Sequence, residues 1–472
     1  MFTQASTTVG RGFLDLGQRI APTRAPRTRT AGANSTWRQQ VVSWDGAVAA
    51  PRSVSQRAPA VSRIVISRST DDDRQFQVSL EQRGATLARG LLRQQQTISA
   101  DCLQELRQSY ERQIRVLHEL SAAGVPVPPP DESRLLILGR RIADLLPGIV
   151  RQEIVTAVRR ARQGRRALRL ALEVTTDARE WLSVPWELMA LPLGWGPRDG
   201  AGQDDFLFLN ADVALVRQVR GVGLNMPLAL SRPLRIQAFA AAPLYAQSID
   251  LSTTYQTIEQ VRPAADAPRH WYDGHDTLSV LQERLSETHP QVVHLVCHGE
   301  RSDTGRGRPR YDLLFTHLEG YAHRVGATDL ARALTLAPDL QLVVLQACHS
   351  GATVLSSGGG VHDRHLVESI ALTLVRSGVP TVIAMQGEVG QGAAAAFARA
   401  CYIALAQGRD LDRAVAAGRI AMRSAGGVVD WSLPVVYQGS GPMEQDSWYI
   451  RLANRLRALF PGTRLAKAPA LS

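Results

Sequence analysis

The sequence predicts an α/β protein built on a mostly parallel sheet with helices on both faces, that is, an α/β/α sandwich. Three observations lead to this fold class. The second half of the chain contains four fully apolar runs, helix-like segments separate them, and the first half begins with two short runs of alternating character. Strands covered on both faces have continuous apolar sequences, and parallel neighbours need a long crossover between them. The 472 residues leave ample room for such a core.

The first folded element expected is a β-hairpin. Residues 1–60 mix Thr, Ser, Pro, Ala and Arg without an apolar period, which is typical of a disordered arm. SRIVISR and RQFQVSLEQ follow, and the turn-like STDDD between them predicts two paired strands. We therefore expect the folded region to begin at residue 61.

Helices and two more strands are expected in the rest of the first half, which we assign to residues 61–232. Residues 87–123 and 135–162 have helical spacing on either side of the proline-rich break VPVPPPDES. LRLALEV and ADVALVRQV are the next strand candidates. The first half is thus predicted to be a hairpin plus helices and a smaller share of the sheet.

The second half, residues 233–442, contains the predicted parallel core. Its strand candidates are LRIQAFAAAP, QVVHLVCHG, LQLVVLQAC and PTVIAMQ, with VDWSLPVVYQG as a last strand. Segments such as TLSVLQERLSE, ATDLARAL and AAAAFARACYIALAQG predict the helices between them. Residues 443–472 include DSWYIRLANRLRALFPG, whose apolar residues share one helical face, and predict an amphipathic helix with a short tail.

The composition of the chain argues against nucleic-acid binding, a membrane span and a metal or disulfide site. The 54 Lys and Arg residues exceed the 43 Asp and Glu residues, but the arginines are spread along helical segments without a nucleic-acid-binding motif, which favours solvated helix faces over a nucleic-acid site. No apolar run approaches the roughly 20 residues of a membrane span. The four cysteines are scattered without a CxxC pair, so we expect no disulfide framework, no metal, no cofactor, and a reducing compartment, the cytoplasm.

Two of the predicted strands end in chemically reactive residues. One closes with His298 and Gly299, and the other with Cys348, His349, Ser350 and Gly351. Parallel strands bring their carboxyl ends to one edge of a sheet, where catalytic groups collect. An imidazole beside a thiol can take the thiol proton during attack on a carbonyl. The pattern predicts a Cys348–His298 pair.

The spacing and the flanking residues support this pair. Cys348 follows His298 by 50 residues, and Gln-Ala-Cys matches the caspase signature, although the glycine stands one position later than in that signature. Together with LSVPWELM, SGVPTVIAMQ, AFARACYIALAQGRDLDRAVAAGR and DWSLPVVYQG, the segments HLVCHG and LQACHSG resemble the CHAT domain. This family of caspase-like and separase-like cysteine peptidases is often found in bacteria, and the similarity runs from about residue 61 to 441.

The resemblance implies a fold and roles for particular residues. It implies a caspase-type α/β/α sandwich, with an N-terminal half that is a non-catalytic caspase-like unit. It also implies that His298 is the general base or acid, that Cys348 is the nucleophile, and that the backbone N–H groups of Gly299 and Cys348 are the oxyanion donors. In separase-like relatives, an acidic residue after the strand equivalent to TVIAMQ holds a basic substrate side chain. Here Gln386, Glu388 and Gln391 are the pocket candidates, with Gln391 at the expected position of the acid.

Other reactive-looking residues have simpler interpretations. His349 adjoins the thiol in sequence, but consecutive residues at a strand end point to opposite faces, so we expect a neighbour and not the base. His294 and Cys297 lie inside an apolar run and are expected to be core residues. Trp186 and Glu187 are assigned to the fold, with Glu187 as the partner of an arginine or of a helix amino terminus.

Two function classes follow. The first is a cysteine endopeptidase that cleaves a protein substrate through a thioester acyl-enzyme. Because the loops at 299–312 and 349–363 are rich in Gly, Ser and charge, we expect this enzyme to be latent until an activating protein partner binds. The resemblance implies a setting in bacterial defence or regulated cell death. The second class is a catalytically silent CHAT-fold scaffold that recruits a partner.

Overall fold

The computed structural model describes most of the chain between residues 59 and 441. The described residues are 59–68, 75–82, 85–93, 100–123, 129–193, 206–223, 228–244, 246, 249, 255–256, 258–259, 276–302, 310–357 and 364–441. The predicted N-terminal arm and C-terminal amphipathic helix lie outside them. No helix within the described ranges is long and apolar enough to cross a membrane.

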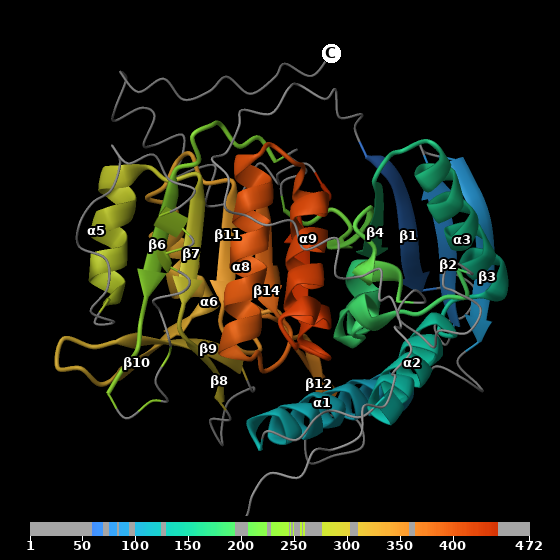
Figure 1. Ribbon diagram of the computed structural model, residues 1–472, viewed down its shortest axis with the longest axis horizontal. Helices are drawn as coiled ribbons and strands as arrows, with labels where there is room; N and C mark the ends of the chain where they lie inside the picture. Colours follow the sequence, from blue (N-terminus) through green and yellow to red (C-terminus); the bar gives the residue numbers. More distant parts are fainter. Residues whose placement is uncertain are drawn as a thin grey trace, which may run out of the picture. The chain divides into compact units, whose positions relative to one another are not determined.

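The described core is a ten-stranded sheet with the order β3-β2-β1-β4-β5-β15-β14-β11-β7-β6 (Figure 1). It contains two parallel blocks: β1, β4, β5 and β15 in one, and β14, β11, β7 and β6 in the other. The blocks meet at the antiparallel pair of β14 and β15. The strands are β1 Ala60–Arg68, β2 Gln75–Gln82, β3 Ala85–Arg93, β4 Leu168–Val174, β5 Val213–Val219, β6 Ile236–Ala240, β7 Val292–Val296, β11 Leu342–Gln346, β14 Thr381–Met385 and β15 Pro434–Gln438.

Helices and two small sheets surround these strands. Figure 1 shows α8 and α9 side by side in front of the central strands, and α1 beside β12. The helices are α1 Ala100–Ala122, α2 Pro129–Ala143, α3 Gly148–Gln163, α5 Leu278–Thr288, α6 Ala327–Leu334, α7 Ile370–Arg376, α8 Gln391–Ala406 and α9 Leu411–Ser424, with short 3-10 turns η2 Thr176–Ser183, η3 Trp186–Leu188, η5 Leu207–Leu209 and η7 Asp430–Ser432. In one small sheet, β9 Arg310–Thr316 pairs on one side with β8 His298–Ser302 and on the other with β10 Ala322–Gly326. In the other, β12 Val354–Ser357 pairs with β13 Arg364–Val367.

The predicted fold class is confirmed. Every residue of β5, β6, β7, β11, β14 and β15 is buried, as expected for strands covered on both faces. The predicted hairpin is also present, because β1 and β2 pair antiparallel from Arg63 opposite Glu81 to Arg68 opposite Phe76. The continuous apolar runs of the sequence therefore predicted the strands that form the centre of the core.

One prediction about the first half is wrong. The helix expected over residues 87–123 begins only at Ala100, and residues 85–93 form β3 instead. β3 pairs antiparallel with β2, with a register irregularity after Leu80. The available hydrogen bonds along β2 outweigh the helical spacing of this segment, since tertiary pairing routinely overrides local propensity.

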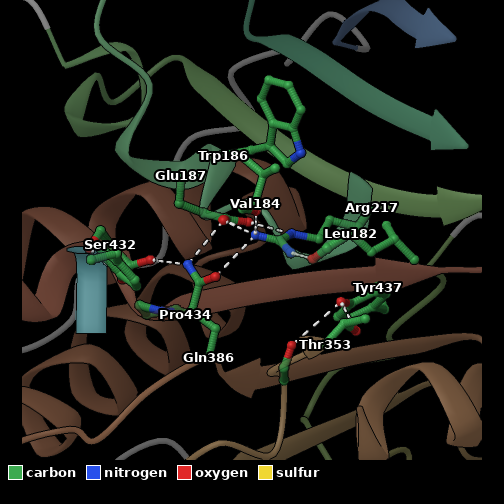
Figure 2. A network of polar contacts seen from close by, with 12 residues as sticks. Leu182, Val184, Trp186, Glu187, Arg217, Thr353, Gln386, Ser432, Pro434 and Tyr437 are labelled. Carbon is green, nitrogen blue, oxygen red and sulfur yellow. Dashed lines mark hydrogen bonds and ion pairs between the residues drawn. The ribbon is translucent and has the colours of Figure 1, made fainter. Parts of the chain in front are cut away.

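A buried ion pair lies where the two blocks of the sheet meet (Figure 2). Arg217 on β5 and Glu187 on η3 are almost wholly inaccessible, with 1% and 0% of their side chains exposed. The Arg217 guanidinium donates through Nε to Glu187 Oε1 at 3.0 Å and through Nη1 to the Leu182 carbonyl at 2.7 Å, and Nη2 pairs with Glu187 Oε2. The predicted role of Glu187 as an arginine partner is thus confirmed.

Gln386, directly after β14, extends this ion pair into a network. Its Oε1 accepts from Arg217 and from Arg107 of α1, each at 3.2 Å. Its Nε2 donates to Glu187 Oε2 at 3.1 Å and to the Ser432 carbonyl at 2.8 Å (Figure 2). A fully paired network tolerates burial, whereas a single unpaired member is costly in a low-dielectric interior. The network therefore fixes β5, η3, β14, η7 and α1 against one another.

We predict that Arg217→Met destabilises the protein by about 3–5 kcal/mol, because it leaves the Glu187 carboxylate buried without its partner. Chemical denaturation of both proteins measures the difference. The matched control is Arg332→Ala, which removes an arginine from an exposed ion pair with Asp329 and should change little. Equal stability of wild type and Arg217→Met would contradict the role given to the ion pair.

Candidate active site

The register of the sheet places the two predicted catalytic residues at one edge. β7 and β11 are parallel neighbours, with Val296 opposite Gln346. His298 and Cys348 each follow two residues later, and the Cys297 N–H donates to the Gln346 carbonyl at 3.4 Å. The carboxyl ends of these two strands thus bring His298 and Cys348 to the same edge of the sheet.

Gly299 brings the backbones of the two segments into close contact. A Cβ built on Gly299 would collide with the carbonyl oxygen of Cys348 and lie 3.3 Å from its nitrogen. Only a residue without a side chain permits this approach. The observation joins the His-Gly and Ala-Cys segments directly, as the sequence predicted from their positions at strand ends.

The turn that follows β11 is fastened to the end of β14. The Gly351 N–H donates to the Met385 carbonyl at 2.8 Å, and the His349 N–H donates to the Gly387 carbonyl at 3.3 Å. Ser350 is fully buried, and its Oγ donates to the Ala347 carbonyl at 2.8 Å and accepts from the Met385 N–H at 3.2 Å. These bonds fix the turn that contains Cys348 to the end of β14.

His349 takes a different position from His298. Its φ is +58°, a left-handed conformation that non-glycine residues seldom adopt. Its ring stacks on Tyr311 of β9 with centroids 5.9 Å apart and an interplanar angle of 11°, and its Nε2 lies 3.9 Å from Glu388 Oε1. This arrangement agrees with its interpretation as a neighbour of the thiol.

The surroundings of Cys348 stabilise its neutral form. Burial raises the pKa of the Cys348 thiol above its ordinary value, and the carboxylates of Glu388 and Asp430 raise it further. The backbone N–H groups of Val389 and of Cys348 itself lower this pKa, because hydrogen bonds to sulfur stabilise the thiolate. The effect of burial is the larger, so the resting side chain is a thiol at neutral pH.

The three pocket candidates have different surroundings. Glu388 is exposed in the loop after β14, and Gln391 is exposed at the first position of α8. A hydrogen bond with His349 lowers the pKa of the Glu388 carboxyl. Gln386, in contrast, is fully buried, with its amide bonded to four groups of the network. The prediction that Gln386 lines the substrate pocket is therefore wrong. Its side chain is part of the buried network and anchors the start of the loop after β14.

Two residues near the thiol were not predicted from the sequence. Asp430 of η7 accepts from the Gly390 N–H at 2.9 Å, and the same oxygen, Oδ1, lies 3.0 Å from His118 Nε2 of α1. The hydrogen bond to Asp430 raises the pKa of His118. His118 is 312 positions from Asp430 in sequence, in a segment with no motif, so only the packing of α1 against the loop identifies it.

His294 and Cys297, which were expected to be core residues, are both buried. His294 is fully buried between the Tyr402 hydroxyl at 2.7 Å from Nδ1 and the Gln346 amide oxygen at 3.2 Å from Nε2. Burial lowers the pKa of His294 to about 4 and raises that of Cys401 to about 12. Within the described residues, no three His, Cys, Asp or Glu side chains form a group suited to a metal ion.

A family model matches this chain over a long segment. The model is that of the CHAT domain, and the match covers residues 137–440, well over half of the chain. The chain belongs to the CHAT-domain family. No curated protein sequence matches the chain.

Several solved structures match this CHAT domain at low sequence identity. The structure of the Arg-specific cysteine proteinase gingipain R matches with 13% identity and a TM-score of 0.38, over 63% of this chain and 68% of that chain. The Saccharomyces cerevisiae separase–securin complex matches with 11% identity and a TM-score of 0.43, over 80% of this chain and 30% of that chain. A complex of the pro- and mature domains of Porphyromonas gingivalis RgpB gives 13% identity and a TM-score of 0.37, over 63% and 70%.

We predict that Gly299→Ala destabilises the protein by about 1–3 kcal/mol, because the added methyl group collides with the Cys348 backbone and forces the two segments apart. The matched control is Gly392→Ala near the start of α8, where an added Cβ meets no atom within 4 Å and a helix gains a better helix former. Thermal unfolding of the two variants gives the comparison. A stable Gly299→Ala protein would show that the two segments are not in contact.

We also predict that Cys348 of the isolated protein reacts with iodoacetamide at neutral pH more slowly than the same cysteine in a short peptide, and that its rate rises with pH through the alkaline range. The reason is the raised pKa of the thiol, since only the thiolate attacks. Peptide-resolved mass spectrometry follows each site, and the buried Cys401 reports unfolding. Faster reaction of Cys348 than of the peptide at pH 7 would contradict the inferred surroundings.

Proposed function

We propose that this protein is a cysteine-type endopeptidase with Cys348 as the nucleophile and His298 as its general base and acid. The observation that carries the proposal is the contact between Gly299 and the Cys348 backbone, because it brings the His-Gly segment against the Ala-Cys segment at one sheet edge. Membership of the CHAT family supports the same reading. The substrate class proposed is protein, with no cofactor.

The proposed reaction proceeds in two steps. His298 takes the thiol proton, the Cys348 sulfur attacks the scissile carbonyl carbon, and a tetrahedral oxyanion forms. The C–N bond then breaks, the leaving amine takes the proton from His298, and a thioester links the acyl half of the substrate to Cys348. A water molecule, deprotonated by His298, hydrolyses the thioester and regenerates the thiol.

Backbone donors for the oxyanion are proposed at Gly299 and Cys348. A hydrogen-bond donor aimed at a developing oxyanion contributes roughly 3–4 kcal/mol to transition-state stabilisation. The close contact between the Gly299 and Cys348 backbones supports this assignment, since it brings the two proposed donors to the same edge of the sheet. Glu388, exposed in the loop after β14, and Gln391, exposed at the start of α8, are the proposed contacts for the substrate side chain.

We further propose that the enzyme is latent in isolation. The support is the raised pKa of the Cys348 thiol, which burial and the nearby carboxylates of Glu388 and Asp430 produce. An activating protein partner that exposes the thiol to water, or that moves either carboxylate away, increases the thiolate fraction. A bacterial defence or cell-death pathway in the cytoplasm is the proposed setting, by family resemblance.

The competing function is a CHAT-fold scaffold without catalysis. The raised thiol pKa also fits this alternative, because a cysteine that never reacts has no need of an activated form. Labelling by a thiol-directed probe distinguishes the two. An enzyme labels at Cys348 in a manner that depends on His298 under an activating condition.

The decisive experiment compares new protein amino termini in cells that express wild type, Cys348→Ala or His298→Ala. We expect cleavage products in the wild-type cells alone, because both side chains are needed to form and resolve the thioester. The sequences around the new termini then give the substrate and the residue preferred at the cut. The matched control is Cys102→Ala, which removes a half-buried thiol of α1 and should retain every cut. Identical sets of termini in wild-type and Cys348→Ala cells would rule out the peptidase proposal and favour the scaffold.

A further inference from the structure

One face of helix α1 contacts the two loops that border the thiol. Arg107 donates to the Gln386 side chain at 3.2 Å and to the Gln386 carbonyl, and the Tyr110 hydroxyl lies 2.8 Å from Ser432 Oγ. Ile114 borders Gly387, and His118 bonds to Asp430 at 3.0 Å. These positions are spaced by three, four and four residues, so they form one stripe along the helix.

The last contact of this stripe reaches the thiol through a short chain of bonds. His118 pairs with Asp430, and the same Asp430 oxygen accepts from the Gly390 N–H at 2.9 Å. The neighbouring residue, Val389, directs its own N–H to the Cys348 sulfur. His118 therefore holds the segment that covers the thiol, although it does not touch the thiol itself.

The first three members of the stripe are explained by packing, whereas His118 is not. Arg107, Tyr110 and Ile114 are buried, as expected of a helix that covers a core. His118 keeps 27% of its side chain exposed, and Asp430 keeps only 6%. A half-buried histidine at the end of this stripe supplies less packing than the three buried residues before it. Its specific contribution is the hydrogen bond that fixes Asp430 and the loop.

We propose that α1 is the positioning element of the site and that His118 is a positioning residue, which acts through Asp430 and Gly390 to hold the loop at 387–390 over Cys348. α1 lies wholly outside the segment matched by the CHAT family model. The helix thus couples a part of the chain beyond the matched domain to the reactivity of the thiol. The catalytic meaning of this coupling rests on the proposed peptidase activity, but the coupling itself is measurable without a substrate.

The test is the rate of iodoacetamide alkylation of the full-length protein, resolved by site with mass spectrometry. In His118→Phe, we expect Cys348 to react about tenfold faster than in wild type, because loss of a charge-assisted hydrogen bond lets the loop open and burial of the thiol is what suppresses its reactivity. Cys401, fully buried on α8, should remain protected in both proteins.

Two further variants complete the design. His118→Gln retains an N–H donor for Asp430 and should restore a rate close to that of wild type. Glu119→Ala changes the exposed neighbour that faces away from the stripe and should leave the Cys348 rate unchanged. Equal Cys348 rates in wild type and His118→Phe overturn the proposal. So does a parallel rise at Cys348 and Cys401, because it shows general destabilisation instead of loop release. Failure of the peptidase proposal would appear in the amino-terminus experiment and would leave these rates unaffected.

Discussion

The buried pair of Arg217 and Glu187 is the interaction on which the arrangement of this protein depends. Two ions removed from water need partners for every donor and acceptor, and the pair finds them on elements far apart in the sequence. The partners include Gln386, which directly follows the strand that ends beside the candidate nucleophile. Because Gln386 must hydrogen-bond to this ion pair, the pair fixes the first residue of the loop near Cys348.

The candidate site combines placement by the sheet with surroundings that favour a neutral thiol. Parallel pairing of β7 and β11 brings His298 and Cys348 to one edge of the sheet, and Gly299 lets the backbones of the two segments touch. The thiol, however, is buried near two carboxylates, which disfavour its thiolate. Separate features therefore control the position of the two residues and the protonation of the thiol. The sheet controls the position, and the loop after β14 together with α1 controls the surroundings of the thiol.

The sequence predicted the parts of the structure that depend on local periodicity and on strand ends. Continuous apolar runs identified β6, β7, β11 and β14, and the residues that close two of them identified His298 and Cys348 as neighbours. It did not predict β3, because the pairing offered by β2 is a long-range effect. It also misplaced Gln386, whose burial depends on Arg107 and Arg217, residues 279 and 169 positions away. Long-range polar partners leave no periodic trace in a sequence.

The position of β15 has a consequence for how the chain reaches its native state. This strand is the last in sequence among the described strands, yet it lies in the middle of the sheet and is what joins β5 to β14. During synthesis, the edges of β5 and β14 therefore stay open until residues 434–438 leave the ribosome, and η7, which contains Asp430 and Ser432, arrives only just before them. The loop that covers Cys348 thus acquires its final shape only when nearly all of the described chain has been made, which ties the geometry of the site to completion of the sheet.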